Sequence, residues 1–72
     1  MKDYHVNIFY SKEDDCYIAD IPDLPNCSAF GETPDKALKE VQITKDLWIK
    51  TAKEMGKRIP KPRYRPVFYQ AV

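Results

Sequence analysis

Four aspartates in the first third of the sequence are the residues that most obviously suggest chemistry. Asp14 and Asp15 are adjacent, and Asp20 and Asp23 follow within eight residues. Carboxylates clustered in this way hold the divalent ions of two-metal nucleases. Acids are equally ordinary in a hairpin turn and at strand ends, and we favour this interpretation. The sequence therefore predicts no catalytic residue and no metal site here.

His5 and Cys27 are the other side chains that could act as a base or a nucleophile. His5 alternates with Asp3 and Asn7, but no motif places a nucleophile beside it. Cys27 follows a turn, yet no helix N-terminus or similar context lowers its pKa. A structural zinc site is not expected either, because CxxC and HxxxH spacings are absent. We expect neither an enzyme nor a cofactor.

A group of basic residues lies near the end of the sequence, close to Tyr64 and Tyr69. It consists of Lys57, Arg58, Lys61, Arg63 and Arg65. Phosphate pairing combined with aromatic stacking would suit RNA or DNA. The same charges would suit the acidic face of a partner protein or a sister subunit, or would form a solvated tail. The sequence leaves these alternatives open.

Composition limits the classes to which the chain can belong. Seventy-two residues make one domain, and a net charge of +1 with 43% apolar residues fits neither a strongly basic nucleic-acid binder nor a disordered chain. A domain of this size has marginal stability alone. We expect a cytoplasmic protein with reduced thiols, no signal peptide and no membrane segment, stabilised as a homodimer or homotetramer.

The elements that would position these residues follow from the apolar pattern. Alternation over residues 4–10 and a β-rich run over 16–21 predict a hairpin. Pro22 and Pro25 predict a turn before a short strand over residues 27–30.

A long helix is predicted between Thr33 and Gly56. Thr33 suits the N-cap, Pro34 the first helical position and Gly56 the C-terminal cap. Gly31 is expected to supply an unusual backbone angle between strand and helix. The apolar stripe is expected to contain Ala37, Leu38, Val41, Thr44, Trp48, Ala52 and Met55. Ile43 and Leu47 widen this stripe, which suggests a second buried surface.

Three prolines predict an extended basic tail, after which residues 67–69 form a last strand at an edge or exchanged with a neighbour. The expected fold class is α+β: a small antiparallel sheet in the order β-β-β-α-β, with one long helix packed on it. Residues 1–72 form one domain, with sheet and helix in 1–56 and the tail in 57–72.

The segment YIADIPDLPNCSAFGETPDKALKEV resembles the HicB family of small antitoxins. The shared pattern includes IPDLP, a cysteine after the turn, and Gly31, Thr33 and Ala37 at the helix start. The later stretch with Gly56, Ile59, Pro60 and Pro62 is also similar. The resemblance implies a truncated RNase-H-like fold and a non-catalytic protein that binds and neutralises a HicA-type mRNA-cleaving toxin of a type II toxin-antitoxin system.

One departure from the family is expected to matter. Only ten residues follow Pro62, so no C-terminal DNA-binding domain is expected, and direct operator repression is doubtful. The alternatives are an orphan HicB-like oligomer that binds RNA through its basic tail, and a metal-dependent nuclease.

A basic toxin is expected to bind to an acidic surface of this protein. We expect strand pairing to bring the acids of the proline turn and the acids of the helix start into one docking rim, with a leucine as its apolar anchor. The basic tail is expected to face elsewhere. The members of the rim are Asp20, Asp23, Leu24, Glu32 and Asp35.

Overall fold

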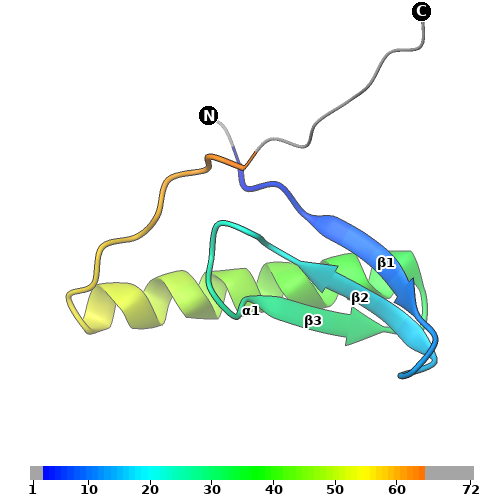
Figure 1. Ribbon diagram of the computed structural model, residues 1–72. Helices are drawn as coiled ribbons and strands as arrows, with labels where there is room; N and C mark the ends of the chain where they lie inside the picture. The colour runs from blue at the N-terminus through cyan, green and yellow to red at the C-terminus, as the bar shows by residue number, and fades with distance from the viewer. Residues whose placement is uncertain (1–2, 65–72) are drawn as a thin grey trace, which may run out of the picture.

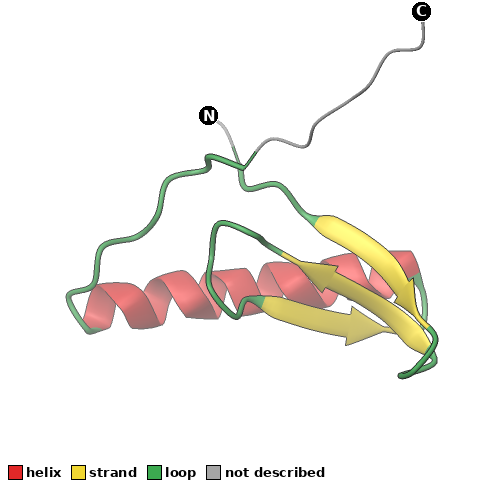
Figure 2. Ribbon diagram, in the orientation of Figure 1, coloured by secondary structure: helices red, strands yellow, loops and turns green. Residues whose placement is uncertain are grey.

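The computed structural model describes residues 3–64, which form a three-stranded antiparallel sheet and one helix (Figure 1). The strands are β1 (Asn7–Ser11), β2 (Cys16–Asp20) and β3 (Ser28–Gly31), and the helix is α1 (Pro34–Glu54). The strands lie in the order β1-β2-β3, and α1 packs along one face of the sheet (Figure 2). The α+β prediction is confirmed. The strand predicted over residues 67–69 lies outside the described residues.

The register of the strands divides their side chains between two faces. Ile8 pairs with Ala19, which pairs with Ala29, and Ala19 is fully buried against the helix. Because side chains alternate along a strand, the neighbouring residues point away from α1. The first strand begins three residues later than predicted, although Tyr4 and Val6 still pack against the core.

The core lies between β2, α1 and the turn that follows β2. Ala19, Ala37 and Val41 are buried at its centre. The turn is closed by Ile21 N–H donating to the Cys27 carbonyl (3.0 Å) and Cys27 N–H donating to the Leu24 carbonyl (3.1 Å). This geometry points Ile21, Leu24 and Cys27 inward, where all three are buried. The predicted proline turn is therefore confirmed, and the structure adds that it contributes three side chains to the core.

Both helix caps are those predicted. Thr33 Oγ1 accepts a hydrogen bond from Lys36 N–H (3.2 Å), and Pro34 opens the helix. At the other end Gly56 has φ 69°, its N–H donates to the Lys53 carbonyl, and Lys57 N–H donates to the Ala52 carbonyl. These two bonds are those of a Schellman motif.

Two predictions about this region are wrong. Gly31 does not have a left-handed backbone. A Cβ at Gly31 would lie 2.5 Å from Ala37 N and 2.8 Å from Lys36 Cβ, so the residue allows β3 to end against the start of α1. Met55 does not belong to the buried stripe, because it is 61% exposed.

Candidate partner-binding surface

The five residues predicted to form one docking rim do not come together. Asp20 ends β2 and Asp23 lies in the next turn, whereas Glu32 and Asp35 follow the opposite end of β3. The length of β3 separates the two pairs. Leu24 is 1% exposed and cannot serve as a surface anchor. The predicted rim is wrong because antiparallel pairing of β2 and β3 places consecutive connections at opposite ends of the sheet.

Asp23 binds the basic segment, defined here as residues 57–64. Its carboxylate accepts hydrogen bonds from the backbone N–H groups of Arg63 (3.0 Å) and Tyr64 (3.0 and 3.1 Å). The prediction that the basic tail faces away from the acids is therefore wrong for this residue. Asp23 is instead the residue that attaches the segment to the turn after β2.

Two aromatic contacts fix the same segment to the beginning of the chain. The Tyr4 hydroxyl donates to the Pro60 carbonyl, and the rings of His5 and Tyr64 lie 4.8 Å apart. Burial together with the nearby Asp23 and Asp3 charges raises the pKa of Tyr4. The basic segment is therefore attached to the beginning of the chain through Tyr4 and His5, and the Tyr64 ring already has one aromatic neighbour.

The charged side chains of this segment remain accessible. Lys57, Arg58, Lys61 and Arg63 are all exposed, and Arg65 lies outside the described residues. The segment presents cations to solvent from a backbone that is fixed at Pro60, Arg63 and Tyr64.

The turn between β1 and β2 concentrates negative charge at one end of the sheet. Glu13, Asp14 and Asp15 are exposed there and outnumber Lys12. The Tyr10 hydroxyl donates to Asp15 (2.5 Å), which raises the pKa of Tyr10. Asp14 accepts from Ser11 Oγ (3.0 Å), and its N–H contacts the same oxygen. The acids are thus anchored in a tight turn.

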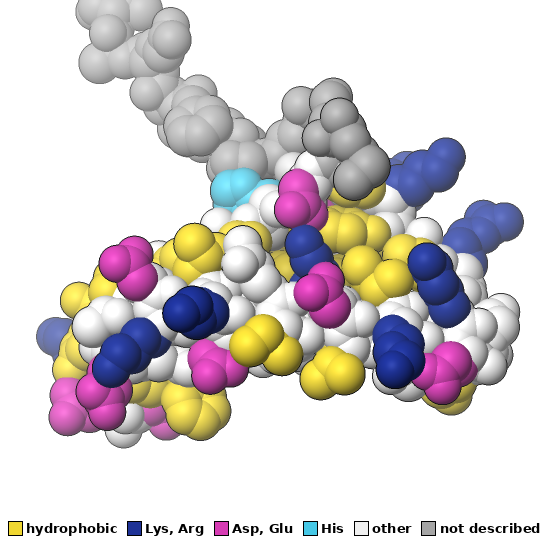
Figure 3. Space-filling model, turned by 180° about the vertical axis from the view of Figure 1, so that it is seen from behind, with side chains coloured by type: hydrophobic (Ala, Val, Ile, Leu, Met, Phe, Trp, Pro, Cys, Tyr) yellow, Lys and Arg dark blue, Asp and Glu magenta, His cyan; other side chains and the backbone are white. Residues whose placement is uncertain are grey.

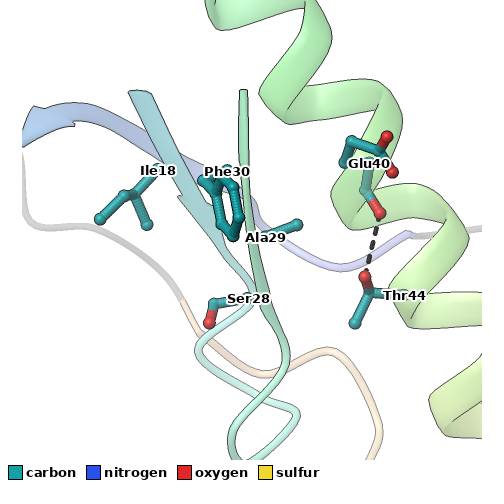
Figure 4. Close-up of a pocket in the computed structure, with 6 residues that line it drawn as sticks. All are labelled: Ile18, Ser28, Ala29, Phe30, Glu40 and Thr44. Carbon is teal, nitrogen blue, oxygen red and sulfur yellow. Dashed lines mark hydrogen bonds between the residues drawn. The ribbon is translucent and has the colours of Figure 1, made fainter. Parts of the chain in front are cut away.

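An apolar row crosses the face of the sheet that α1 leaves uncovered. Phe9 pairs with Ile18, which pairs with Phe30, so one side chain from each strand lies in a line. Phe9 is 50% exposed and Phe30 is 71% exposed. Ile18 and Phe30 lie on the side away from the helix, while Ala29 points toward it (Figure 4). Two exposed phenylalanines in register are more than scattered surface residues and indicate a contact surface.

A shallow hollow follows the edge of β3 beside this row. Ile18, Ser28 and Phe30 border it on the strand side, and Glu40 and Thr44 border it on the helix side (Figure 4). Thr44 Oγ1 donates to the Glu40 carbonyl (3.0 Å), so the hydroxyl is occupied within the helix. The hollow adds an accessible edge to the apolar row and brings no reactive group to it.

Alternation along the strands was the signal that could have found this row. Alternation over residues 4–10 puts Phe9 on the face opposite Ile8 and Tyr10, in agreement with the register, but the row also requires the pairing of three strands. That register also depends on how the two turns between the strands close, which the residue types alone do not determine.

The residues considered for catalysis are dispersed. Asp14 and Asp15 precede β2, whereas Asp20 and Asp23 lie at and beyond its end. His5 Nε2 lies 2.7 Å from Asn7 Oδ1. Within residues 3–64, no three His, Cys, Asp or Glu side chains group as a metal ion would require.

Cys27 is buried among apolar residues, and burial raises the pKa of its thiol. Such a thiol is the opposite of an activated nucleophile. No helix in the described part of the chain has the length and apolar character needed to cross a membrane.

Comparison with known proteins gives one informative relative. Over 53 aligned residues, the chain is 38% identical to UPF0150 protein ssl0259 from Synechocystis sp.. The alignment covers 74% of this chain and 73% of the relative. No family model matches the chain. No solved structure matches it either.

Proposed function

This chain belongs to the UPF0150 family, which is the HicB-like family. From this membership and the resemblance of its sequence to HicB antitoxins, we propose that it is a non-catalytic protein that binds and neutralises a HicA-type mRNA-cleaving toxin. The observation that supports this function best is the apolar row Phe9, Ile18 and Phe30 on the uncovered sheet face. A protein partner would bury the row, and exposed aromatic side chains are the usual anchors of protein interfaces.

Charge at the two ends of this face suits a basic partner. Asp20 lies on the same face by alternation, in register with Asn7 and Ser28. At the other end, the turn between β1 and β2 carries Glu13, Asp14 and Asp15. A toxin that binds RNA presents cations, so acids flanking an apolar centre would favour its association and would cover its RNA-binding surface.

The proposal is tested by coexpression with the HicA-type protein encoded nearest to this gene. We expect this chain to restore growth that the toxin arrests, and the double variant Phe9→Ser with Phe30→Ser to fail. Met55→Ser is the matched control, because it also removes an exposed apolar side chain, but from the end of α1. Growth arrest that persists with the wild-type chain, or the absence of any such neighbour, contradicts the proposal.

RNA binding by the basic segment is the second candidate. Its support is the set of four exposed cations, Lys57, Arg58, Lys61 and Arg63, on a fixed backbone. Against it, the Tyr64 ring already contacts His5. If RNA is the partner, the affinity for a single-stranded oligonucleotide must fall steeply between 50 and 200 mM salt, roughly in proportion to the phosphates neutralised.

A further inference from the structure

The face of α1 that points away from the sheet carries a seam of six exposed side chains. They are spaced alternately by four and three residues, which keeps them on one stripe of the helix, as in a coiled-coil seam. The six are Lys36, Glu40, Ile43, Leu47, Lys50 and Glu54. The view onto the back of the molecule shows hydrophobic side chains set among charges of both signs (Figure 3).

The centre of the seam is apolar. Ile43 is 52% exposed and Leu47 is 59% exposed, and both lie one helical turn from the polar members on either side. Leaving two large aliphatic side chains in water on the most solvated face of a 21-residue helix loses free energy that a second chain could recover.

In a second copy of the helix that runs antiparallel to the first, each charge of the seam lies opposite a charge of the other sign. In an antiparallel copy related by a twofold axis near residue 45, Lys36 lies opposite Glu54, Glu40 lies opposite Lys50, and Ile43 lies opposite Leu47. In a parallel arrangement each residue would meet its own equivalent, so that Lys would face Lys and Glu would face Glu. The pattern therefore selects one orientation.

We propose that two copies of this chain form a symmetric dimer through antiparallel packing of their α1 helices along this seam. The six positions extend about 27 Å along the helix at 1.5 Å per residue. The contact is isologous, since both copies use the same surface. On one flank Asp46 would face its own equivalent and Lys39 would face Lys53 of the second copy, and these exposed like charges have room to extend into water.

The apolar row lies on the sheet face that α1 does not cover, and only its Phe30 end shares a hollow with Glu40 of the seam. Phe9, on β1, lies at the end of the row away from this hollow, so the dimer leaves that part of the row free. It supplies the additional burial that a chain of 72 residues needs for stability. The inference does not depend on the identity of a toxin, and its test uses this chain alone.

Sedimentation of charge-reversed chains tests the dimer. The wild-type chain should sediment at twice its mass of 8.4 kDa. E40K places lysines opposite each other at two symmetric positions, and K50E does the same with glutamates. Each variant alone should dimerise about tenfold more weakly or worse. An equal mixture of E40K and K50E restores both opposite-charge pairs and should form a heterodimer of near wild-type affinity.

Two controls separate the seam from other surfaces. Phe9→Ser, on β1 at the other edge of the sheet, should leave the dimer intact, whereas Ile43→Ser with Leu47→Ser should abolish it. Far-ultraviolet circular dichroism checks that each variant keeps its helix. A wild-type chain that sediments as a folded monomer at 100 μM overturns the proposal, as does undiminished dimerisation of both E40K and K50E.

Discussion

Gly31 shows how a single residue can be identified for one physical reason and required for another. The sequence marks it as a glycine between strand and helix, which suggests a special backbone angle. The structure requires it because a Cβ would collide with the backbone of Ala37 and with Lys36. Such a collision depends on how closely β3 approaches α1, which no local pattern contains.

Gly31→Ala should therefore destabilise the fold through overpacking, by about 1–3 kcal/mol. Gly56→Ala is the matched control, because a Cβ at Gly56 meets no atom within 4 Å. Its only cost is holding alanine at a positive φ, which should lower the free energy of unfolding by about 1 kcal/mol. Urea unfolding with an unchanged slope measures both. A smaller loss at Gly31 than at Gly56 would refute the steric explanation.

Cys27 gives a second test at this scale. Because burial raises the pKa of its thiol, the thiolate is disfavoured in the folded state. In a Cys16→Ser variant the remaining thiol should react with a disulfide reagent at pH 8 at least about a hundredfold more slowly than in 8 M urea. Equal rates in both conditions would show that the turn holding Cys27 is open.

At the scale of elements, helix ends were far easier to predict than strand relations. Thr33 and Gly56 act through hydrogen bonds to residues a few positions away and Pro34 acts through its fixed φ, so the local sequence contains nearly all the information. The rim of Asp20, Asp23, Glu32 and Asp35 failed because adjacency in sequence was taken for adjacency in space. Antiparallel pairing separates the two connections by the whole of β3.

The attachment of the basic segment is the element-level prediction. Asp23→Ala removes the acceptor for two backbone N–H groups and should release residues 57–64 from the turn. Trypsin should then cut after Arg58 and Arg63 several times faster than in the wild-type chain. Asp20→Ala is the control, since Asp20 makes no such contact among the described residues. Equal cleavage of the two variants would refute the role of Asp23.

For the whole molecule, the sequence predicted the fold class, the helix and a second surface on that helix at Ile43 and Leu47, but not the apolar row of the sheet. The α+β arrangement followed from apolar periodicity, which reports burial one element at a time. The apolar row requires the register of three strands. The exposure of Ile43 and Leu47 in the folded chain shows that the sheet does not cover the second helix surface. Both surfaces are long-range consequences of packing.

The central claim is that the uncovered sheet face binds a basic toxin, and calorimetric titration of the neighbouring HicA-type protein tests it most directly. Phe30→Ser should weaken binding about thirtyfold, as expected for an aromatic anchor worth ~2 kcal/mol. Met55→Ser should bind within twofold of the wild-type chain, because that side chain lies at the end of α1. Equal affinities of wild type, Phe30→Ser and Met55→Ser would contradict the assignment of this face.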